Sequence, residues 1–171
     1  SSPKAAAARR ASVELLLSNH NQNCQQCDKN GHCELLYVAQ ITGAREGKFQ
    51  GAKTPVTIDQ LTPSIIRDTS KCILCGRCVA RCVSAHGTGI LGFEKRGFNT
   101  IVSPAENRSF GESPCILCGQ CVNVCPTGAL MEKSEISLID EAKKAGKYLV
   151  VQTAPAVRAA LGEEFGMKIG T

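Results

Sequence analysis

Two stretches of the sequence carry the same dense cysteine pattern. They are CILCGRCVARC at residues 72–82 and CILCGQCVNVC at residues 115–125, and each has the spacing C-x2-C-x2-C-x3-C. Four sulfur atoms within so short a stretch can meet only if the chain forms a tight loop around whatever they bind. This repeat constrains the fold of the 171-residue chain more than any other feature.

The spacing of the repeat is typical of loops that hold a pair of 4Fe-4S clusters. Three cysteines of such a loop hold one cluster, and the fourth, which we expect at the start of a helix, reaches the neighbouring cluster. Pro126 follows the second repeat as in the ferredoxin signature, whereas Val83 takes that position after the first. The predicted ligand sets are Cys72, Cys75, Cys78 and Cys125 for one cluster, and Cys82, Cys115, Cys118 and Cys121 for the other.

Two other uses of cysteine fit the sequence less well. Zinc sites usually pair two separated C-x2-C knuckles instead of placing four cysteines in one stretch. Disulfides are disfavoured by the odd total of 11 cysteines, by their tight clustering and by the absence of a secretory apolar segment at the start. No apolar run approaches the ~20 residues of a membrane span. We therefore expect a reducing, cytoplasmic setting.

The composition argues against nucleic acid as a partner. The formal net charge is +5, but cysteines deprotonate when they bind metal, so 11 ligating thiolates would offset it. Aromatic residues make up 4% of the chain and form no stacking pattern beside the basic residues. So few large side chains also build only a small core, which bound clusters would help to stabilise.

The segments around the repeats predict an α+β, ferredoxin-like domain. Residues 64–72 favour a strand that enters the first cysteine loop, and residues 90–103 favour a hairpin with its turn at residues 95–97. After the second repeat, Ser134 and Gly146 are typical of the start and end of a helix.

The last part of the chain contains no cysteine. Residues 148–152 predict a buried strand, and Thr153 with Pro155 predicts the start of a further helix. A strand and helix of this kind could simply close the ferredoxin-like domain.

Three cysteines lie outside the repeats, at positions 24, 27 and 33, and a cluster needs a fourth ligand. The chain has three histidines to offer. His32 is next to Cys33, and adjacent residues rarely reach two corners of one cluster. His20 gives the spacing H-x3-C-x2-C-x5-C, whereas His86 lies beyond the first repeat. On spacing alone, a structural role for His20 is as well supported as a ligand role.

The run VELLLSNHNQNCQQCDKNGHCELL, residues 13–36, resembles a known cluster domain with one histidine and three cysteine ligands. Iron-only (FeFe) hydrogenases, the large iron–sulfur subunit of respiratory complex I and some NAD-linked formate dehydrogenases share it. The resemblance implies a third 4Fe-4S cluster on His20, Cys24, Cys27 and Cys33. A neutral imidazole in place of a thiolate makes such a site less negative and easier to reduce.

Two further stretches distinguish among these families. TAPAVRAALGEEFG at residues 153–166 resembles the opening of the catalytic domain of iron-only hydrogenases, and TPSIIRDTSKCILCGRC at residues 62–78 also favours them over complex I. SSPKAAAARRASVELLL at residues 1–17 resembles the helix that follows a plant-type 2Fe-2S domain in these enzymes; its composition also fits a transit peptide.

The resemblance to iron-only hydrogenases implies three domains. We expect a histidine-ligated cluster domain at residues 1–50, a two-cluster ferredoxin-like domain at residues 51–146 and the start of a catalytic domain at residues 147–171. No cysteine follows Cys125, so the cysteines that hold the catalytic H-cluster are not in this sequence. The H-cluster and a 2Fe-2S cluster are expected only in flanking regions.

The resemblance also implies an electron relay in a multisubunit, NAD(P)-linked hydrogenase. The expected partners are flavin- or NAD(P)-binding iron–sulfur subunits, or ferredoxin. Alternatives are the iron–sulfur segment of a formate dehydrogenase or a complex-I-like subunit. A stand-alone electron carrier or an assembly scaffold would also fit.

Overall fold

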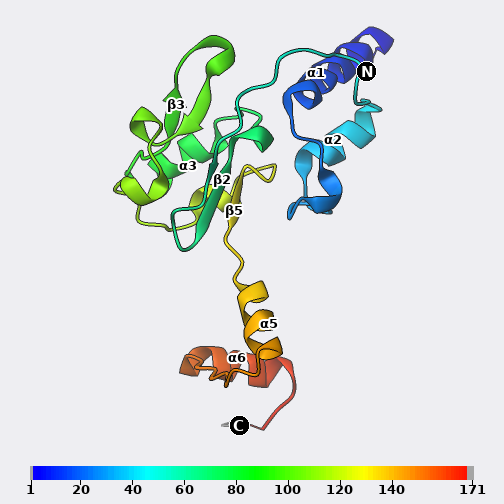
Figure 1. Cartoon of the computed structure of the whole chain (residues 1–171). Helices are drawn as coiled ribbons and strands as arrows, with labels where there is room; N and C mark the ends of the chain where they lie inside the picture. Colours follow the sequence, from blue (N-terminus) through cyan, green and yellow to red (C-terminus); the bar gives the residue numbers. More distant parts are fainter. Residues whose placement is uncertain (1, 169–171) are drawn as a thin grey trace. The chain divides into compact units, whose positions relative to one another are not determined.

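The computed structural model describes residues 2–168 and divides the chain into two compact units, Ser1–Lys133 and Ser134–Thr171. The first unit contains all the predicted ligands and consists of a helical part followed by a part with both helices and strands (Figure 1). The second unit contains two helices. The chain is thus of mixed helix and sheet content, as expected.

The helical part consists of two helices that pack on each other (Figure 1). Helix α1 covers Pro3–Asn19 and helix α2 covers Glu34–Thr42, with a short 3-10 turn at Cys24–Gln26 between them. Ser2 caps α1 by accepting from the Ala5 N–H, and α2 ends at Gly43, whose φ of 64° suits glycine. The buried side chains that join the two helices repeat at helical spacing: Val13, Leu17, Leu35 and Ala39.

The second part of this unit contains a three-stranded antiparallel sheet. Strand β1 covers Ile58–Asp59, β2 covers Ile65–Asp68 and β5 covers Leu130–Glu132, in the order β1-β2-β5. Strand β2 is the strand predicted before the first cysteine loop, and its pairing with β5 puts it beside the segment that follows the second loop. The sheet therefore holds the two loops together across a long stretch of sequence.

Two helices and a hairpin cover the sheet. Helix α3 covers Arg77–His86, and the shorter α4 covers Gln120–Asn123. Strands β3 (Gly92–Glu94) and β4 (Ile101–Ser103) pair antiparallel, which confirms the predicted hairpin. Short 3-10 turns lie at Thr69–Lys71, Gly97–Asn99, Ala105–Asn107 and Phe110–Glu112.

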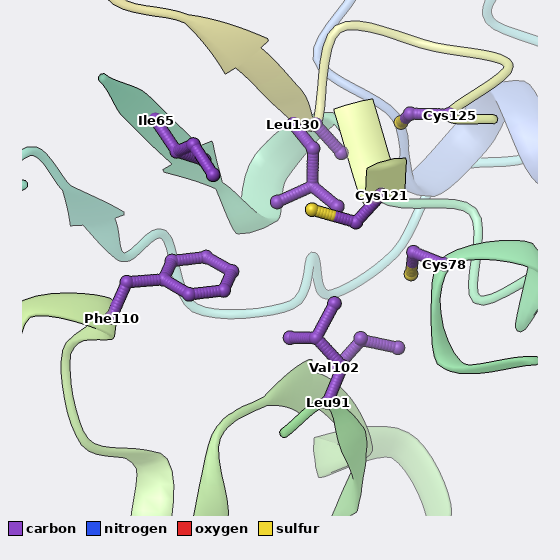
Figure 2. Packing of buried hydrophobic residues seen from close by; sticks show 9 residues of the cluster. Ile65, Cys78, Leu91, Val102, Phe110, Cys121, Cys125 and Leu130 are labelled. Atoms are coloured by element: carbon purple, nitrogen blue, oxygen red, sulfur yellow. The ribbon is translucent and has the colours of Figure 1, made fainter. Parts of the chain in front are cut away.

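The main core lies where these elements meet, and cysteines form part of it. Phe110 is 2% exposed and shares the core with Ile65 and Leu130. Figure 2 shows these side chains around one interior, with the sulfur of Cys121 pointing toward Leu130. Because buried cysteines belong to the same cluster of side chains as the aliphatic core, ligand positions are fixed by packing.

The second unit contains α5 (Ile136–Lys144) and α6 (Pro155–Glu164), which confirms both helices predicted there. Ser134 accepts from the Ile136 N–H, and Gly146 has a φ of 66° just past the end of α5. The cap of α6 is Ala154, one residue after the predicted Thr153.

The buried strand predicted at residues 148–152 is wrong. These residues form no regular element, and Tyr148, Val150 and Val151 are 93%, 80% and 85% exposed. An extended segment is stable as a strand only when neighbouring strands satisfy its backbone groups. Within residues 2–168, no strand pairs with this segment.

Candidate metal centres

The two cysteine loops have the same backbone conformation. Gly76 and Gly119 precede helices α3 and α4 with φ angles of 72° and 69°. Leu74 and Leu117, two residues earlier, have φ angles of 55° and 54°, which non-glycine residues rarely adopt. Such strain persists only where the surrounding structure requires it, and the repetition of these two φ angles in the second loop indicates that both loops are shaped for the same purpose.

Backbone amides in the loops point at the first sulfur of each repeat. The Leu74 N–H donates to Cys72 Sγ at 3.5 Å, and the Leu117 N–H donates to Cys115 Sγ at 3.4 Å. Hydrogen bonds of this kind favour the thiolate form of a cysteine over the thiol form.

The eight repeat cysteines line two separate cavities, and the fourth cysteine of each repeat lines the cavity of the other repeat. One cavity is lined by the first three cysteines of the first repeat and by Cys125. The other is lined by the first three cysteines of the second repeat and by Cys82. We name these the Cys125 cavity and the Cys82 cavity.

The fourth cysteine of each repeat is not at the start of a helix, so that prediction is wrong. Helices α3 and α4 begin at Arg77 and Gln120, directly after the loop glycines and before the third cysteine. Cys82 therefore lies one turn into α3, and Cys125 lies just beyond the end of α4. The left-handed glycines start the helices earlier than the spacing suggested.

The thiols differ in how easily they ionise. Burial raises the pKa of Cys78 to about 12 and that of Cys121 to about 11. Burial also acts to raise the pKa of Cys82, but hydrogen bonds from the Thr88 hydroxyl and nearby backbone N–H groups lower it overall. Buried thiols with raised pKa values lose their protons at neutral pH only when a cation binds them, so these sites suit a metal-containing group.

His20 lies at the end of α1 with one ring nitrogen buried and unpaired. Its side chain is 7% exposed, and no hydrogen bond is made to its Nδ1 atom. Burial lowers the pKa of His20, and the charge on Lys71 acts in the same direction. A hydrogen bond with the Lys71 backbone acts the other way. Burial therefore favours the neutral imidazole, which is the form that binds a metal.

A cavity of about 150 Å³ lies beside this ring. Its walls include His20, Cys24 and Cys33, together with apolar residues of α1 and α2. Cys27 is not among its lining residues. Cys27 Sγ instead lies against Gly128, where an added Cβ would be only 2.9 Å from the sulfur. The structure thus brings three of the four predicted side chains together and places the fourth at the junction with the sheet.

The remaining histidines are exposed, His32 in the loop before α2 and His86 at the end of α3. Within residues 2–168, no three His, Cys, Asp or Glu side chains converge closely enough to hold a single metal ion. The ligands of a cubane bind four separate iron atoms, so they line a cavity and need not meet at one point.

The helical part is joined to the sheet next to the Cys125 cavity. The Asn21 N–H donates to the Ser70 carbonyl at 2.9 Å, and the Glu34 N–H donates to the Pro126 carbonyl at 3.0 Å. Pro126 lines the Cys125 cavity, and Ser70 lies two residues before Cys72, which also lines it. The cavity beside His20, which we name the His20 cavity, is thus adjacent to the Cys125 cavity.

Charged residues around the Cys125 cavity were missed by sequence reasoning. Arg67, on strand β2, lines this cavity and is 3% exposed. Asp68 lines it too, and its carboxylate is 3.6 Å from the Lys71 ammonium. The sequence did contain one indication of these residues. Arg67 and Asp68 form a charged pair at the end of an otherwise apolar strand, and such a pair favours a role inside the protein.

Two family models match the chain. The "NADH-ubiquinone oxidoreductase-G iron-sulfur binding region" matches residues 9–48, and the "4Fe-4S dicluster domain" matches residues 71–129. The chain therefore contains 4Fe-4S-binding domains. No helix within residues 2–168 has the length and apolar character needed to cross a bilayer.

Similar proteins include hydrogenases. The NADP-reducing hydrogenase subunit HndD of Solidesulfovibrio fructosivorans is 43% identical over 96% of this chain, and iron hydrogenase 1 of Clostridium pasteurianum is 36% identical over 92%. In both cases the match spans 28% of the relative's own length.

A solved structure of an NAD⁺-reducing [NiFe]-hydrogenase in the H2-reduced state is also similar. It has a TM-score of 0.72 and 28% sequence identity, covering 79% of this chain and 58% of that one. Together with the two cysteine cavities and the matched regions, the similarity to HndD and to iron hydrogenase 1 shows that the chain belongs to the iron-only hydrogenase family, as an iron–sulfur segment.

Proposed function

We propose that this chain relays electrons through three 4Fe-4S clusters in an iron-only hydrogenase of the multimeric, NAD(P)-linked type. The observation that carries the proposal is the pair of cavities, each lined by four cysteines from both repeats. Clusters of this kind take up and release single electrons, with potentials set by charge and hydrogen bonding around them.

The proposed ligand sets follow the predicted ones. In the Cys125 cavity they are Cys72, Cys75, Cys78 and Cys125, and in the Cys82 cavity they are Cys82, Cys115, Cys118 and Cys121. The third set is His20, Cys24, Cys27 and Cys33, supported by the unpaired His20 Nδ1 atom. We assign these sets to a histidine-ligated domain at residues 1–50 and to a two-cluster ferredoxin-like domain at residues 51–146, with residues 147–171 as the start of a catalytic domain.

The residues of the chain serve this role by holding the ligands in a mostly apolar core. The packing of Cys78 and Cys121 among buried side chains excludes water from the sulfur atoms. The loop amides at Leu74 and Leu117 are already aimed at sulfur. Fixed dipoles of this kind need little rearrangement when an electron arrives.

We further propose that the chain works in the cytoplasm within a multisubunit enzyme. Electrons would pass between flavin- or NAD(P)-binding iron–sulfur subunits, or ferredoxin, and a hydrogen-forming H-cluster in the longer protein. The similarity to an NADP-reducing hydrogenase subunit supports this type. A complex-I-like role is less favoured, because the complex I relatives match 72–75% of the chain, whereas the two hydrogenases match 96% and 92%.

Metal analysis of the anaerobically prepared chain tests the proposal. We expect about twelve iron and about twelve labile sulfide per chain, because each of three cubanes contributes four of each. Zinc should be negligible. A value of about eight iron, with zinc bound to the cysteines near His20, would contradict the third site and leave only the ferredoxin-like pair.

The chain by itself is expected to evolve no hydrogen. All of its cysteines are assigned to the three sites, and none follows Cys125 to hold a further cluster. Gas chromatography with a reduced dye as donor checks this. Sustained hydrogen evolution by the purified 171-residue chain would contradict the relay role.

A further inference from the structure

A buried cation lies beside only one of the two cysteine cavities. Arg67 is 3% exposed and lies on β2, the middle strand of the three-stranded sheet. The Arg67 Nη1 atom donates to the Val102 carbonyl at 3.2 Å, while Nε is buried without a hydrogen-bond partner. Arg67 therefore lines the Cys125 cavity and keeps one buried donor, Nε, unused.

The nearest carboxylate only partly offsets this charge. Asp59 Oδ2 is 4.0 Å from Arg67 Nε. The same carboxylate accepts from the Phe110 N–H at 2.8 Å and from the Ser109 hydroxyl at 2.7 Å, so it is directed toward that turn. Burial lowers the pKa of Arg67, and the charges of Asp59 and Cys72 oppose this. A guanidinium nevertheless stays protonated in proteins.

The other charges at this cavity form a pair. Asp68 accepts from the Ser70 N–H at 2.9 Å, and its second oxygen is 3.6 Å from Lys71 Nζ. The two opposite charges largely cancel at a distance. Arg67 thus remains the main source of positive field at the cavity.

The Cys82 cavity has no such cation. Phe110 lines it, and Phe110 stands five positions before Cys115 just as Arg67 stands five positions before Cys72. The lining residues of the Cys82 cavity include no charged side chain among those described. The repeat is therefore symmetric in its ligands and asymmetric in the charge at this one position.

We propose that Arg67 raises the reduction potential of the cluster in the Cys125 cavity above that of the cluster in the Cys82 cavity. The inference rests on the proposed function. Reduction adds one negative charge, and a fixed cation in a water-poor site stabilises that charge more than solvent would. Electrons then accumulate preferentially at the site next to the His20 cavity.

Replacing Arg67 tests the inference in the fully loaded 171-residue chain. Redox titration followed by EPR gives the potential of each cluster, and Cys125→Ala and Cys82→Ala variants assign the two signals. For Arg67→Gln we expect about a tenfold lower ratio of reduced to oxidised cluster in the Cys125 cavity at a fixed potential, which is about 59 mV for one electron. Arg67→Lys keeps the charge and should restore most of the ratio.

Arg77 provides a matched control. It is in the first turn of α3, between ligands of the same cavity, but its side chain is 50% exposed and ion-paired with Glu34 at 2.7 Å. Because water screens its charge, Arg77→Gln should change the ratio less than about twofold.

A structural role for Arg67, tying β2 to β4, predicts changes in stability without a shift confined to one cluster. An unshifted Cys125-cavity signal in Arg67→Gln, or equal shifts at both clusters, would overturn the inference. If Arg67→Gln does not keep about twelve iron, the variant Asp59→Asn decides. Removing the carboxylate that opposes Arg67 should raise the potential of the cluster in the Cys125 cavity. An unshifted potential in Asp59→Asn would also overturn the inference. Wild-type protein without about twelve iron would instead overturn the proposed function itself.

Discussion

Cys125→Ala is expected to remove the cluster whose other ligands, Cys72, Cys75 and Cys78, lie 47 or more positions earlier in the sequence. The cluster held by its neighbours in the sequence should stay intact. The reason is that Cys125 lines the cavity of the first repeat. Iron should fall from about twelve to about eight per chain. Cluster-resolved EPR should show loss of one ferredoxin-type signal.

Val124→Ala is the matched control for this change. Val124 packs against the same core but does not line the Cys125 cavity, so the variant should keep its iron. Cys82→Ala should give the mirror result and remove the cluster of Cys115, Cys118 and Cys121. If Cys125→Ala instead lost the cluster of Cys115, Cys118 and Cys121, each repeat would supply all four ligands of its own cluster.

His20→Ala is expected to cost a whole cluster or leave a three-iron form. We propose the unpaired, buried Nδ1 atom as the fourth donor beside the cavity that Cys24 and Cys33 line, and alanine offers no replacement. His20→Cys should keep full iron and lower the potential of this one cluster by on the order of 100 mV, because a thiolate adds a negative charge. Metal analysis and redox titration measure both effects.

His32→Ala controls for the loss of a histidine next to the same cysteines. Its side chain is exposed, so iron content and potential should stay unchanged. If His20→Ala and His20→Cys both kept full iron with an unshifted potential, His20 would be a structural residue and the fourth ligand would have to be sought elsewhere.

Local patterns in the sequence predicted those parts of the fold that local interactions determine. The spacing within residues 72–82 and 115–125 sufficed to predict two loops, because a tight loop depends on its own glycines and cysteines. The hairpin at residues 90–103 likewise depends on alternation and a turn, and the structure confirms it.

Apart from the exchange of the fourth cysteines, features that depend on distant contacts were not predictable. The apolar run at residues 148–152 has the composition of a strand, but the described part of the chain supplies no neighbouring strand, so it stays irregular and exposed. Arg67 next to the Cys125 cavity and Cys27 against Gly128 follow from how β2, β5 and the helical part pack, which no spacing reveals. The partner of His20, the Lys71 backbone, is another such contact.

The exchange of fourth cysteines between the two cavities also affects the order of events during biosynthesis. A ribosome releases Cys78 well before Cys125, and at about 5–20 residues per second the interval lasts a few seconds. During that time three sulfur atoms of the first repeat are outside the ribosome without their fourth partner. Neither site of the repeat can be completed before the second repeat has emerged. Delivery of iron and sulfide to the two proposed clusters would therefore be completed only after the second repeat has emerged.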